Sequence, residues 1–389
     1  MVNTLAAGCC QCVTRKCPAR RLISRDGGAE LHRRIVMNFC QLKIWACAAA
    51  LIAAGALSAQ AQGNGFNTPG NVLISDQYNN RLIEVNPDTN EIIWQFGDGS
   101  SVAGPTSVVG VNDAQRVGAM TLVAGTGVPA GAEPTCPDGC PDNRVMLVDP
   151  NGNITWQYGQ AGVTGGGPNQ LNTPVQNTWL PNHHILITDQ GNARVIEVNH
   201  GKQIVWQYGQ TGITGDGFNQ LNNPNSAELL ANGHILIADE GNNRVIEVDR
   251  KKHIHWSYGC ATCSELNAAA FASRLSDGTT LITDGGNNRI LDVASDGTVI
   301  WSYYTNARPG SVSNPAPSRA LMLKNGNVLI SDQYNMQVIE IDSNQNIVWS
   351  QGQIAVAGNG FDMLNGPYDA KVNGDYTGIT PPQHHDHSH

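Results

Sequence analysis

Four cysteines, arranged as two closely spaced pairs, are the side chains of this sequence with the most definite chemistry. The pairs are Cys136 with Cys140 and Cys260 with Cys263. An even number of such cysteines in an exported chain favours disulfides, so we predict two local bridges that each close a loop. Two alternatives stay open: Cys260 and Cys263 have the spacing of a redox-active pair, and the four thiolates together could bind zinc.

Polar side chains at the beginning of four strand-like segments form the second set of candidates. They are Asn177, Asn225, Arg319 and Asp369. Asparagine and aspartate oxygens are typical calcium ligands, so a calcium site is possible, and no other cofactor is indicated. An asparagine that opens a strand is equally well explained as a turn residue.

The histidines are too scattered to indicate a metalloenzyme. Predicted turns contain His183, His184 and His234, and one predicted outer strand contains His253 and His255. We interpret these as packed or solvated side chains. The His-rich terminus 384–389 could bind a divalent ion, but a flexible end of a chain is a poor catalytic site. No Ser/His/Asp constellation, phosphate-binding loop or dinucleotide motif occurs.

A repeat of about fifty residues must position these candidates. Related copies occupy 71–97, 185–209, 235–259, 281–303 and 328–350. Each unit holds four short β-branched or apolar segments separated by turn residues, which is typical of a four-stranded antiparallel propeller blade. One tryptophan marks the last strand of each of six units: Trp94, Trp156, Trp206, Trp256, Trp301 and Trp349. The predicted fold is therefore all-β, a six-bladed β-propeller.

The two ends of the repeat array complement each other. The first copy begins at its second strand, Asn71–Ser75, with no first strand before it. Near the other end, Gly366–Val372 matches the first strand of the other units, such as 223–229. We predict that this C-terminal strand joins the N-terminal blade and closes the ring, which removes open sheet edges.

A D-x-x-N-x-R motif recurs in the hairpin between the second and third strands of the units. Its members are Asp76, Asn79 and Arg81; Asp189, Asn192 and Arg194; Asp239, Asn242 and Arg244; Asp284, Asn287 and Arg289; and Asp332 with Asn335. The last copy has Gln337 in place of the arginine, and in the second unit we expect Ala124 to replace the aspartate. An Asp that faces an Arg across a hairpin forms a charge-assisted bond, so we interpret the motif as structural.

The chain divides into four segments at the level of sequence. Residues 1–36 have no pattern that folds and are unstructured or a wrongly assigned start, and 37–61 has the charged, apolar and small-residue parts of a signal peptide. The propeller occupies 66–373, and 374–389 is a flexible His-rich tail. The apolar run of the signal is only about fourteen residues, too short for a stable membrane span. We expect a monomer exported to the periplasm or the extracellular space.

The charge of the exported part excludes one class of partner. Residues 1–61 hold 8 of the 23 basic and 2 of the 32 acidic residues, so the remainder has a net charge of −15. Such a surface repels phosphate backbones, and we expect no nucleic-acid binding.

One unit resembles the NHL repeat closely. A Gly-rich loop at 209–222 is followed by Pro224 and then by LIADEGNNRVIEV, which is the NHL order of loop and strand pair. The resemblance covers 66–373 and implies a six-bladed propeller whose function ranges from interaction scaffold to lyase or hydrolase. The strand ending V-x-W-Q-Y-G is also similar to arylsulfate sulfotransferase and quinoprotein propellers. Those sulfotransferases use a histidine on an innermost strand, and no inner strand here supplies one, so we do not expect that activity.

The loops that differ between units gather on one face of the predicted ring. They are the insertion 125–142, the Cys260–Cys263 loop and the Gly-rich loops 159–168, 209–217 and 352–360. Decorated loops on a rigid scaffold commonly bind ligands, so we predict a binding or interaction module that takes a protein or a small molecule on this face. The alternative is a metal-dependent lyase or hydrolase with its site in the channel. An enzyme would show three or more carboxylate, amide or imidazole groups converging there, and we lean against one.

Overall fold

The protein is described here by a computed structural model that covers residues 65–376 and 379–380. The predicted upstream segment 1–36, the signal peptide 37–61 and most of the tail 374–389 lie outside these residues. Within the described part, no helix is long and apolar enough to cross a membrane.

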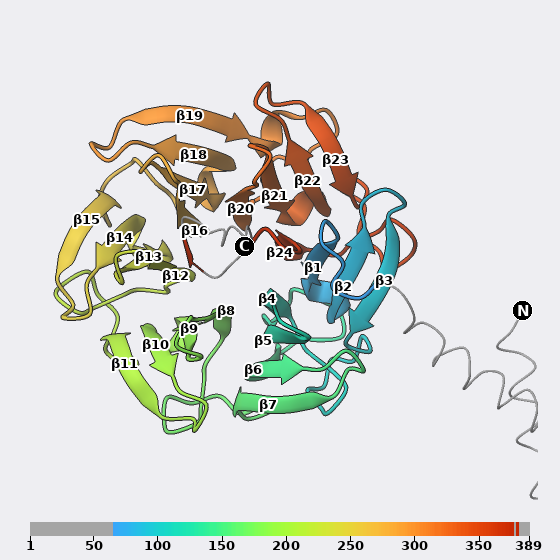
Figure 1. The fold of residues 1–389 in the computed structure, drawn as a ribbon, viewed down its shortest axis with the longest axis horizontal. Coiled ribbons are helices and arrows are strands. Elements are labelled where there is room, and N and C mark those ends of the chain that lie inside the picture. The colour runs from blue at the N-terminus through green and yellow to red at the C-terminus, as the bar shows by residue number, and fades with distance from the viewer. Residues whose placement is uncertain (1–64, 377–378, 381–389) are drawn as a thin grey trace, which may run out of the picture. The chain divides into compact units, whose positions relative to one another are not determined.

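Six antiparallel sheets stand around a central axis, as the prediction requires (Figure 1). From the inner strand outward, the first three blades are β24 (Pro367–Val372), β1 (Val72–Asp76), β2 (Arg81–Asn86) and β3 (Glu91–Phe96); β4 (Val111–Val117), β5 (Met120–Val128), β6 (Cys140–Val148) and β7 (Ile154–Gly159); and β8 (Pro174–Trp179), β9 (Ile185–Asp189), β10 (Arg194–Val198) and β11 (Ile204–Gly209). The last three blades are β12 (Ser226–Leu230), β13 (Ile235–Asp239), β14 (Arg244–Val248) and β15 (Ile254–Gly259); β16 (Ala269–Arg274), β17 (Thr280–Asp284), β18 (Arg289–Val293) and β19 (Val299–Tyr304); and β20 (Arg319–Met322), β21 (Val328–Asp332), β22 (Gln337–Ile341) and β23 (Ile347–Gln351). The all-β six-bladed propeller is confirmed.

Strand β24 closes the ring, as predicted from the sequence. It pairs antiparallel with β1, and Val72 lies opposite Val372 and Ile74 opposite Ala370. Figure 1 shows the two ends of the array side by side, β1 in blue and β24 in red. Beyond β24, the short strand β25 (Ile379–Thr380) adds to the fourth blade by pairing parallel with Leu229 and Leu230 of β12.

The apolar core lies between blades rather than within them. One cluster joins Leu122 and Val145 of the second blade to Ile187 and Ile196 of the third. The middle strands are buried along their whole length, which explains why they are continuous apolar runs in the sequence. Each blade therefore needs its neighbours to bury its two faces.

Five of the six repeated tryptophans are hydrogen-bonded to the next blade: Trp94, Trp156, Trp206, Trp256 and Trp349. The indole nitrogen of Trp94 donates to the backbone carbonyl of Pro150, and that of Trp206 donates to Arg250, at 2.9 and 3.1 Å. Across the closure, Trp349 donates to Pro87 at 3.0 Å. The tryptophans thus have the packing role expected of them, with a specific hydrogen bond in addition.

The repeated Asp-Arg pair is also structural. In the third blade, Arg194 Nε lies 2.7 Å from Asp189 Oδ2, and Asn192 donates to the same oxygen at 2.8 Å. The other carboxylate oxygen accepts the backbone N–H of Asn172 at 2.8 Å. Since Arg194 also donates to the carbonyl of Gly166, the motif fixes the Gly-rich loop above each hairpin.

The second blade departs from the motif at Gly125, and our assignment of Ala124 to that position is wrong by one residue. Gly125 lies opposite Arg144, as Asp189 lies opposite Arg194 in the next blade. The carboxylate of Asp142, from the partner strand, occupies the vacated space, because a Cβ on Gly125 would lie 2.6 Å from its Cγ. Arg144 Nη2 donates to Asp142 at 3.1 Å, so the ion pair survives although the carboxylate comes from another strand.

Candidate functional site

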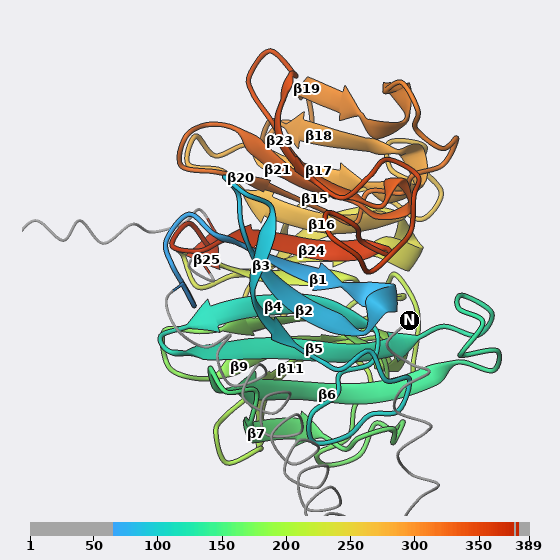
Figure 2. The ribbon, with the colours of Figure 1, turned by 90° about the vertical axis from the view of Figure 1, so that its right-hand side faces the viewer.

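Both cysteine pairs form the predicted local disulfides. Cys136 is bonded to Cys140 in the loop between β5 and β6, and Cys260 to Cys263 in the loop after β15. Strand direction places both loops on one face of the ring, which we call the disulfide face. Figure 2 shows the long β5–β6 hairpin extending from this face, on the side away from β25.

The mouth of the central channel on the disulfide face is hollowed. The hollow has a volume of 590 Å³. Four blades contribute to it the residue that directly follows the aspartate of the repeat motif: Gln77, Gln190, Glu240 and Gln333. These residues begin the short 3₁₀ turns η2 (Gln77–Asn79), η3 (Gln190–Asn192), η4 (Glu240–Asn242) and η7 (Gln333–Asn335). The recurring Asp therefore holds the turn, and the residue after it lies at the axis.

Amide side chains form two hydrogen-bonded arcs around the hollow. In one arc, Gln333 donates to Gln77 at 2.8 Å, and Gln77 donates to Asn112 at 2.7 Å. In the other, Asn225 donates to Glu240 at 2.9 Å and exchanges hydrogen bonds with the hydroxyl of Tyr368. The polar groups are thus held in fixed orientations before any ligand arrives.

Glu240 is the acidic side chain within the hydrogen-bonded arcs of this hollow, and the exposed Asp138 also lines it. Its donors are the amides of Gln190, Asn223 and Asn225, and no Lys or Arg of the described residues forms an ion pair with it. Burial raises the pKa of Glu240. Burial and the Glu240 carboxylate also raise the pKa of Tyr368, so this phenol stays a hydrogen-bond donor. The hollow therefore offers a carboxylate without a cationic counter-charge.

A cluster of buried charges fills the channel below the hollow. Lys371 Nζ lies 2.6 Å from Asp113 Oδ1 and 2.6 Å from Asp369 Oδ2. Arg319 Nη2 lies 2.9 Å from Asp113 Oδ1. Its Nε lies 2.6 Å from Asp369 Oδ1, in an ion-pair contact outside hydrogen-bond geometry. Burial disfavours the ionised form of Asp369, but Arg319 and Lys371 outweigh it and hold the pKa of this carboxyl below its usual value.

The sequence-predicted candidates separate into two places. Arg319 and Asp369 belong to the charge cluster, and Asn177 lies beside it with its backbone N–H on Asp113 at 3.1 Å. Asn225 lies at the mouth instead.

Calcium binding at the cluster stays a proposal that the residues do not favour. The two carboxylates are already neutralised by an ammonium and a guanidinium group. A cation would have to displace Lys371. Among the described residues, no three His, Cys, Asp or Glu side chains are arranged to hold a metal ion.

Sequence reasoning missed Asp113, Glu228 and Lys371. Asp113 and Lys371 are 258 residues apart and lie in different blades. The available signal was that each breaks the pattern of the inner strands with a charged side chain. With these residues, carboxylates and amides from several blades do converge in the channel. The criterion of three or more converging groups that we set for an enzyme is therefore met. The carboxylates of Asp113 and Asp369 are occupied by internal ion pairs.

The closed ring of blades and the hollow on its axis define the class of this protein, a six-bladed β-propeller. The model of the family described as outer membrane protein assembly factor BamB matches residues 141–361, more than half of the chain, and the chain belongs to this family.

Solved structures share the fold at low sequence identity. A protein of unknown function from Bacteroides caccae is 17% identical, with 73% of this chain and 93% of that chain covered and a TM-score of 0.51. Virginiamycin B lyase from Staphylococcus aureus is 14% identical, with coverages of 75% and 86% and a TM-score of 0.45. BamB from Moraxella catarrhalis is 15% identical, with coverages of 72% and 73% and a TM-score of 0.36. No curated protein matches. The first of these likenesses shows the fold alone, and the other two are too distant to support an argument.

Proposed function

We propose that the protein is an exported binding module that takes its partner at the hollow on the disulfide face. The observation that carries this proposal is the repeat position after the recurring aspartate. It is glutamine in three blades and glutamate in a fourth, and these four side chains line the 590 Å³ hollow. A scaffold of recurring residues that presents polar side chains around one concave surface is the arrangement expected of a binding module.

The chemistry of the hollow favours a polar protein segment with a basic side chain. Fixed amides of Gln77, Gln190 and Gln333 can pair with peptide N–H and C=O groups. Glu240 can receive a lysine or arginine, and Tyr78 and Tyr334 offer aromatic faces at the rim. The charge of −15 on the exported part attracts such a partner.

The family supports a setting for this role. Its description names outer membrane protein assembly, so we infer a periplasmic protein that contacts other proteins during that process. The signal peptide at 37–61 and the two disulfides agree with an oxidising compartment. The finer resemblance to NHL repeats, seen best at 209–248, is retained as part of this proposal.

Site-specific photo-crosslinking tests the binding face. A photoreactive amino acid replaces Tyr334 at the rim of the hollow, or Asn344 in the turn between β22 and β23 on the opposite face. We expect a discrete cross-linked protein in cells from position 334 and none from position 344. The double variant Gln77→Ala/Gln333→Ala should abolish the product. Equal cross-linking from both positions, or none from 334, would refute the proposal.

The metal-dependent lyase or hydrolase is the competing hypothesis, and it rests on the carboxylates in the channel. Metal analysis of the purified protein after dialysis distinguishes the two. We expect less than about 0.1 equivalent of calcium or zinc, because Lys371 and Arg319 already neutralise Asp113 and Asp369. One equivalent of either metal would favour the enzyme.

A further inference from the structure

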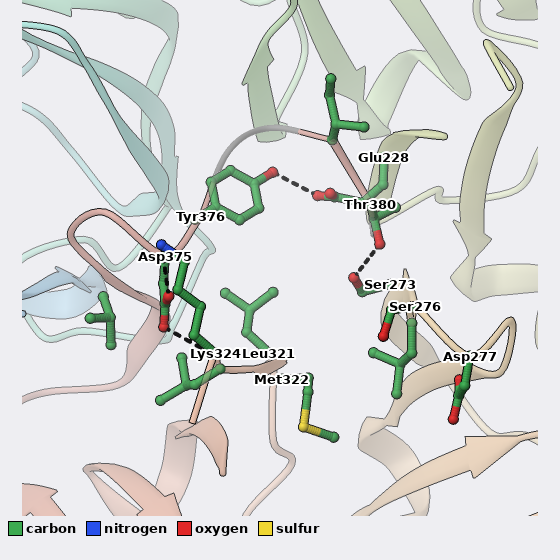
Figure 3. Close-up of a pocket in the computed structure, with 14 residues that line it drawn as sticks. Glu228, Ser273, Ser276, Asp277, Leu321, Met322, Lys324, Asp375, Tyr376 and Thr380 are labelled. Carbon is green, nitrogen blue, oxygen red and sulfur yellow. Dashed lines mark hydrogen bonds and ion pairs between the residues drawn. The ribbon is translucent and has the colours of Figure 1, made fainter. Parts of the chain in front are cut away.

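A second cavity lies at the other end of the channel, away from the disulfide face (Figure 3). Its volume is 380 Å³. The ends of inner strands form one part of its wall, and Asp375, Tyr376, Ile379 and Thr380 form another. We call it the distal cavity. Its lining, unlike that of the hollow, is largely apolar.

Glu228 lies at the inner end of the distal cavity and is fully buried. One carboxylate oxygen, Oε1, accepts hydrogen bonds from Gln176 Nε2 at 2.5 Å and from the hydroxyl of Tyr376 at 2.9 Å. The other oxygen, Oε2, has no donor within the described part of the chain. A buried carboxylate oxygen without a donor is costly, so it marks a place where a hydrogen-bond donor would be favourable.

The charges around Glu228 do not balance. In the channel, the carboxylates of Asp113 and Asp369 are matched by Arg319 and Lys371, and Glu228 is the remaining third carboxylate. Its two hydrogen-bond donors are neutral. An added positive charge would neutralise this set of five buried groups.

The rest of the distal cavity is also acidic. Its other ionisable residues are Asp277, Lys324 and Asp375, and Lys324 lies 3.5 Å from Asp375. Asp277 accepts hydrogen bonds from the backbone and hydroxyl of Thr279 and has no basic partner among the described residues. Both the inner end and the rim therefore favour a cation.

The apolar wall determines the remainder of the ligand. It consists of Leu275, Leu321, Met322, Leu323, Val372 and Ile379. A pocket of this size, mostly apolar with a few polar groups, fits a small organic molecule. A hydrated metal ion would leave this surface in contact with water, whereas an alkyl or aryl group would cover it.

We propose that the distal cavity binds a small primary amine with an apolar body, whose ammonium group donates to the free oxygen of Glu228. The apolar body then lies against Leu321 and Met322. This site is separate from the hollow, so its failure would leave the proposed binding at the disulfide face untouched.

The protonation of Glu228 gives the site a pH dependence. Burial is the largest influence and raises the pKa of Glu228 to about 7, while Arg319, Tyr376 and Lys371 act in the opposite direction and Asp113 adds to the rise. An alkylammonium group, like that of lysine, titrates near about 10. Affinity should therefore increase from pH 6 to pH 8, where the carboxylate is ionised and the amine is still charged.

Calorimetric titration of the intact protein with 2-phenylethylamine tests the proposal. The neutral analogue 2-phenylethanol and the anion 3-phenylpropionate serve as ligand controls. We expect binding of the amine only, with the affinity lowered about 30-fold or more by Glu228→Gln, because the partner of a buried charge is removed. Asp88→Asn, which removes an exposed carboxylate from the turn between β2 and β3, should leave the affinity unchanged.

A second variant keeps the test decisive if Glu228→Gln does not fold. Met322→Trp fills the distal cavity without altering a charge, and it should also abolish binding. No detectable binding of the amine at pH 8, equal binding of 2-phenylethanol, or full affinity in both variants would overturn the proposal. Binding that weakens from pH 6 to pH 8 would overturn it as well.

Discussion

The two ends of the channel differ in character. At the disulfide face, amides surround a hollow of 590 Å³, and the first residues of four hairpin turns line it. At the other end, apolar side chains of inner strands and residues 375–376 and 379–380 line a cavity of 380 Å³ beside one buried carboxylate. The cluster of Asp113, Arg319, Asp369 and Lys371 lies between them. A propeller channel can thus hold two independent sites separated by a plug of ion pairs.

Removal of the plug should have the largest effect on the molecule. Lys371→Ala leaves Asp113 and Asp369 with one cation between them in a fully buried place. We expect the free energy of unfolding to fall by about 3 to 5 kcal/mol, measured by chemical denaturation. Lys324→Ala, which removes a half-exposed amine from the surface, should cost less than about 1 kcal/mol. Equal losses for the two variants would mean that the buried ion pairs of the plug contribute no more to the free energy of unfolding than the exposed pair does.

The pH dependence of stability should distinguish the ends next. The pKa of Glu228 is about 7 in the folded state, against about 4.3 in an unfolded chain. Between these values the folded state binds a proton that the unfolded state has lost, so stability falls as the pH rises. Glu228→Gln should therefore be more stable than the unchanged protein by roughly 3 to 4 kcal/mol at pH 8 and equal to it at pH 4. The same difference at both pH values would contradict the assignment.

Opening a disulfide should affect only the face that carries it. The bridge between Cys136 and Cys140 closes a short loop, so Cys136→Ser/Cys140→Ser should lower the free energy of unfolding by about 2 kcal/mol. Cross-linking from position 334 should fall, and binding of 2-phenylethylamine should not change.

Mass spectrometry after alkylation without a reductant should find none of the four cysteines labelled in the unchanged protein. Labelled cysteines would refute the disulfides.

The smallest effect is expected from the carboxylate of the hollow. Burial raises the pKa of Glu240, so its contribution has the same sign as that of Glu228. Glu240 is only half-buried and is surrounded by amides, so Glu240→Gln should change the free energy of unfolding by less than about 1 kcal/mol. Its effect should instead appear as weaker cross-linking to the partner. A stability change as large as that of Glu228→Gln would remove the contrast between the two ends.

The repeat made the scaffold predictable, because constant residues recur at constant spacing. Trp206 and the pair of Asp189 with Arg194 have the roles that their recurrence predicts. The same approach failed at Gly125. The carboxylate that pairs with the arginine of the second blade belongs to Asp142, on the opposite strand of the hairpin, and an alignment of the repeats by position does not find it.

The candidate sites were less predictable, for a related reason. Lys371 and Glu228 each occur once. Lys371 pairs with Asp369 on its own strand but also with Asp113 of another blade, and Gln176, which donates to Glu228, lies in yet another blade, so no local pattern shows the complete set of partners. Gln77 belongs to no motif that the sequence analysis singles out, and only the turn geometry shows that it lies at the axis.

Strand β24 has a consequence for the order of synthesis. Asp369 and Lys371 lie on the strand that closes the ring, and they supply one carboxylate and one cation to the plug. A nascent chain that has not yet reached Val372 has an open first blade and, at its axis, Asp113 and Arg319 without Asp369 and Lys371. Pairing of β24 with β1 joins segments about three hundred residues apart in sequence, which is expected to be a late and slow step. Ring closure therefore also completes the group of ion pairs at the axis.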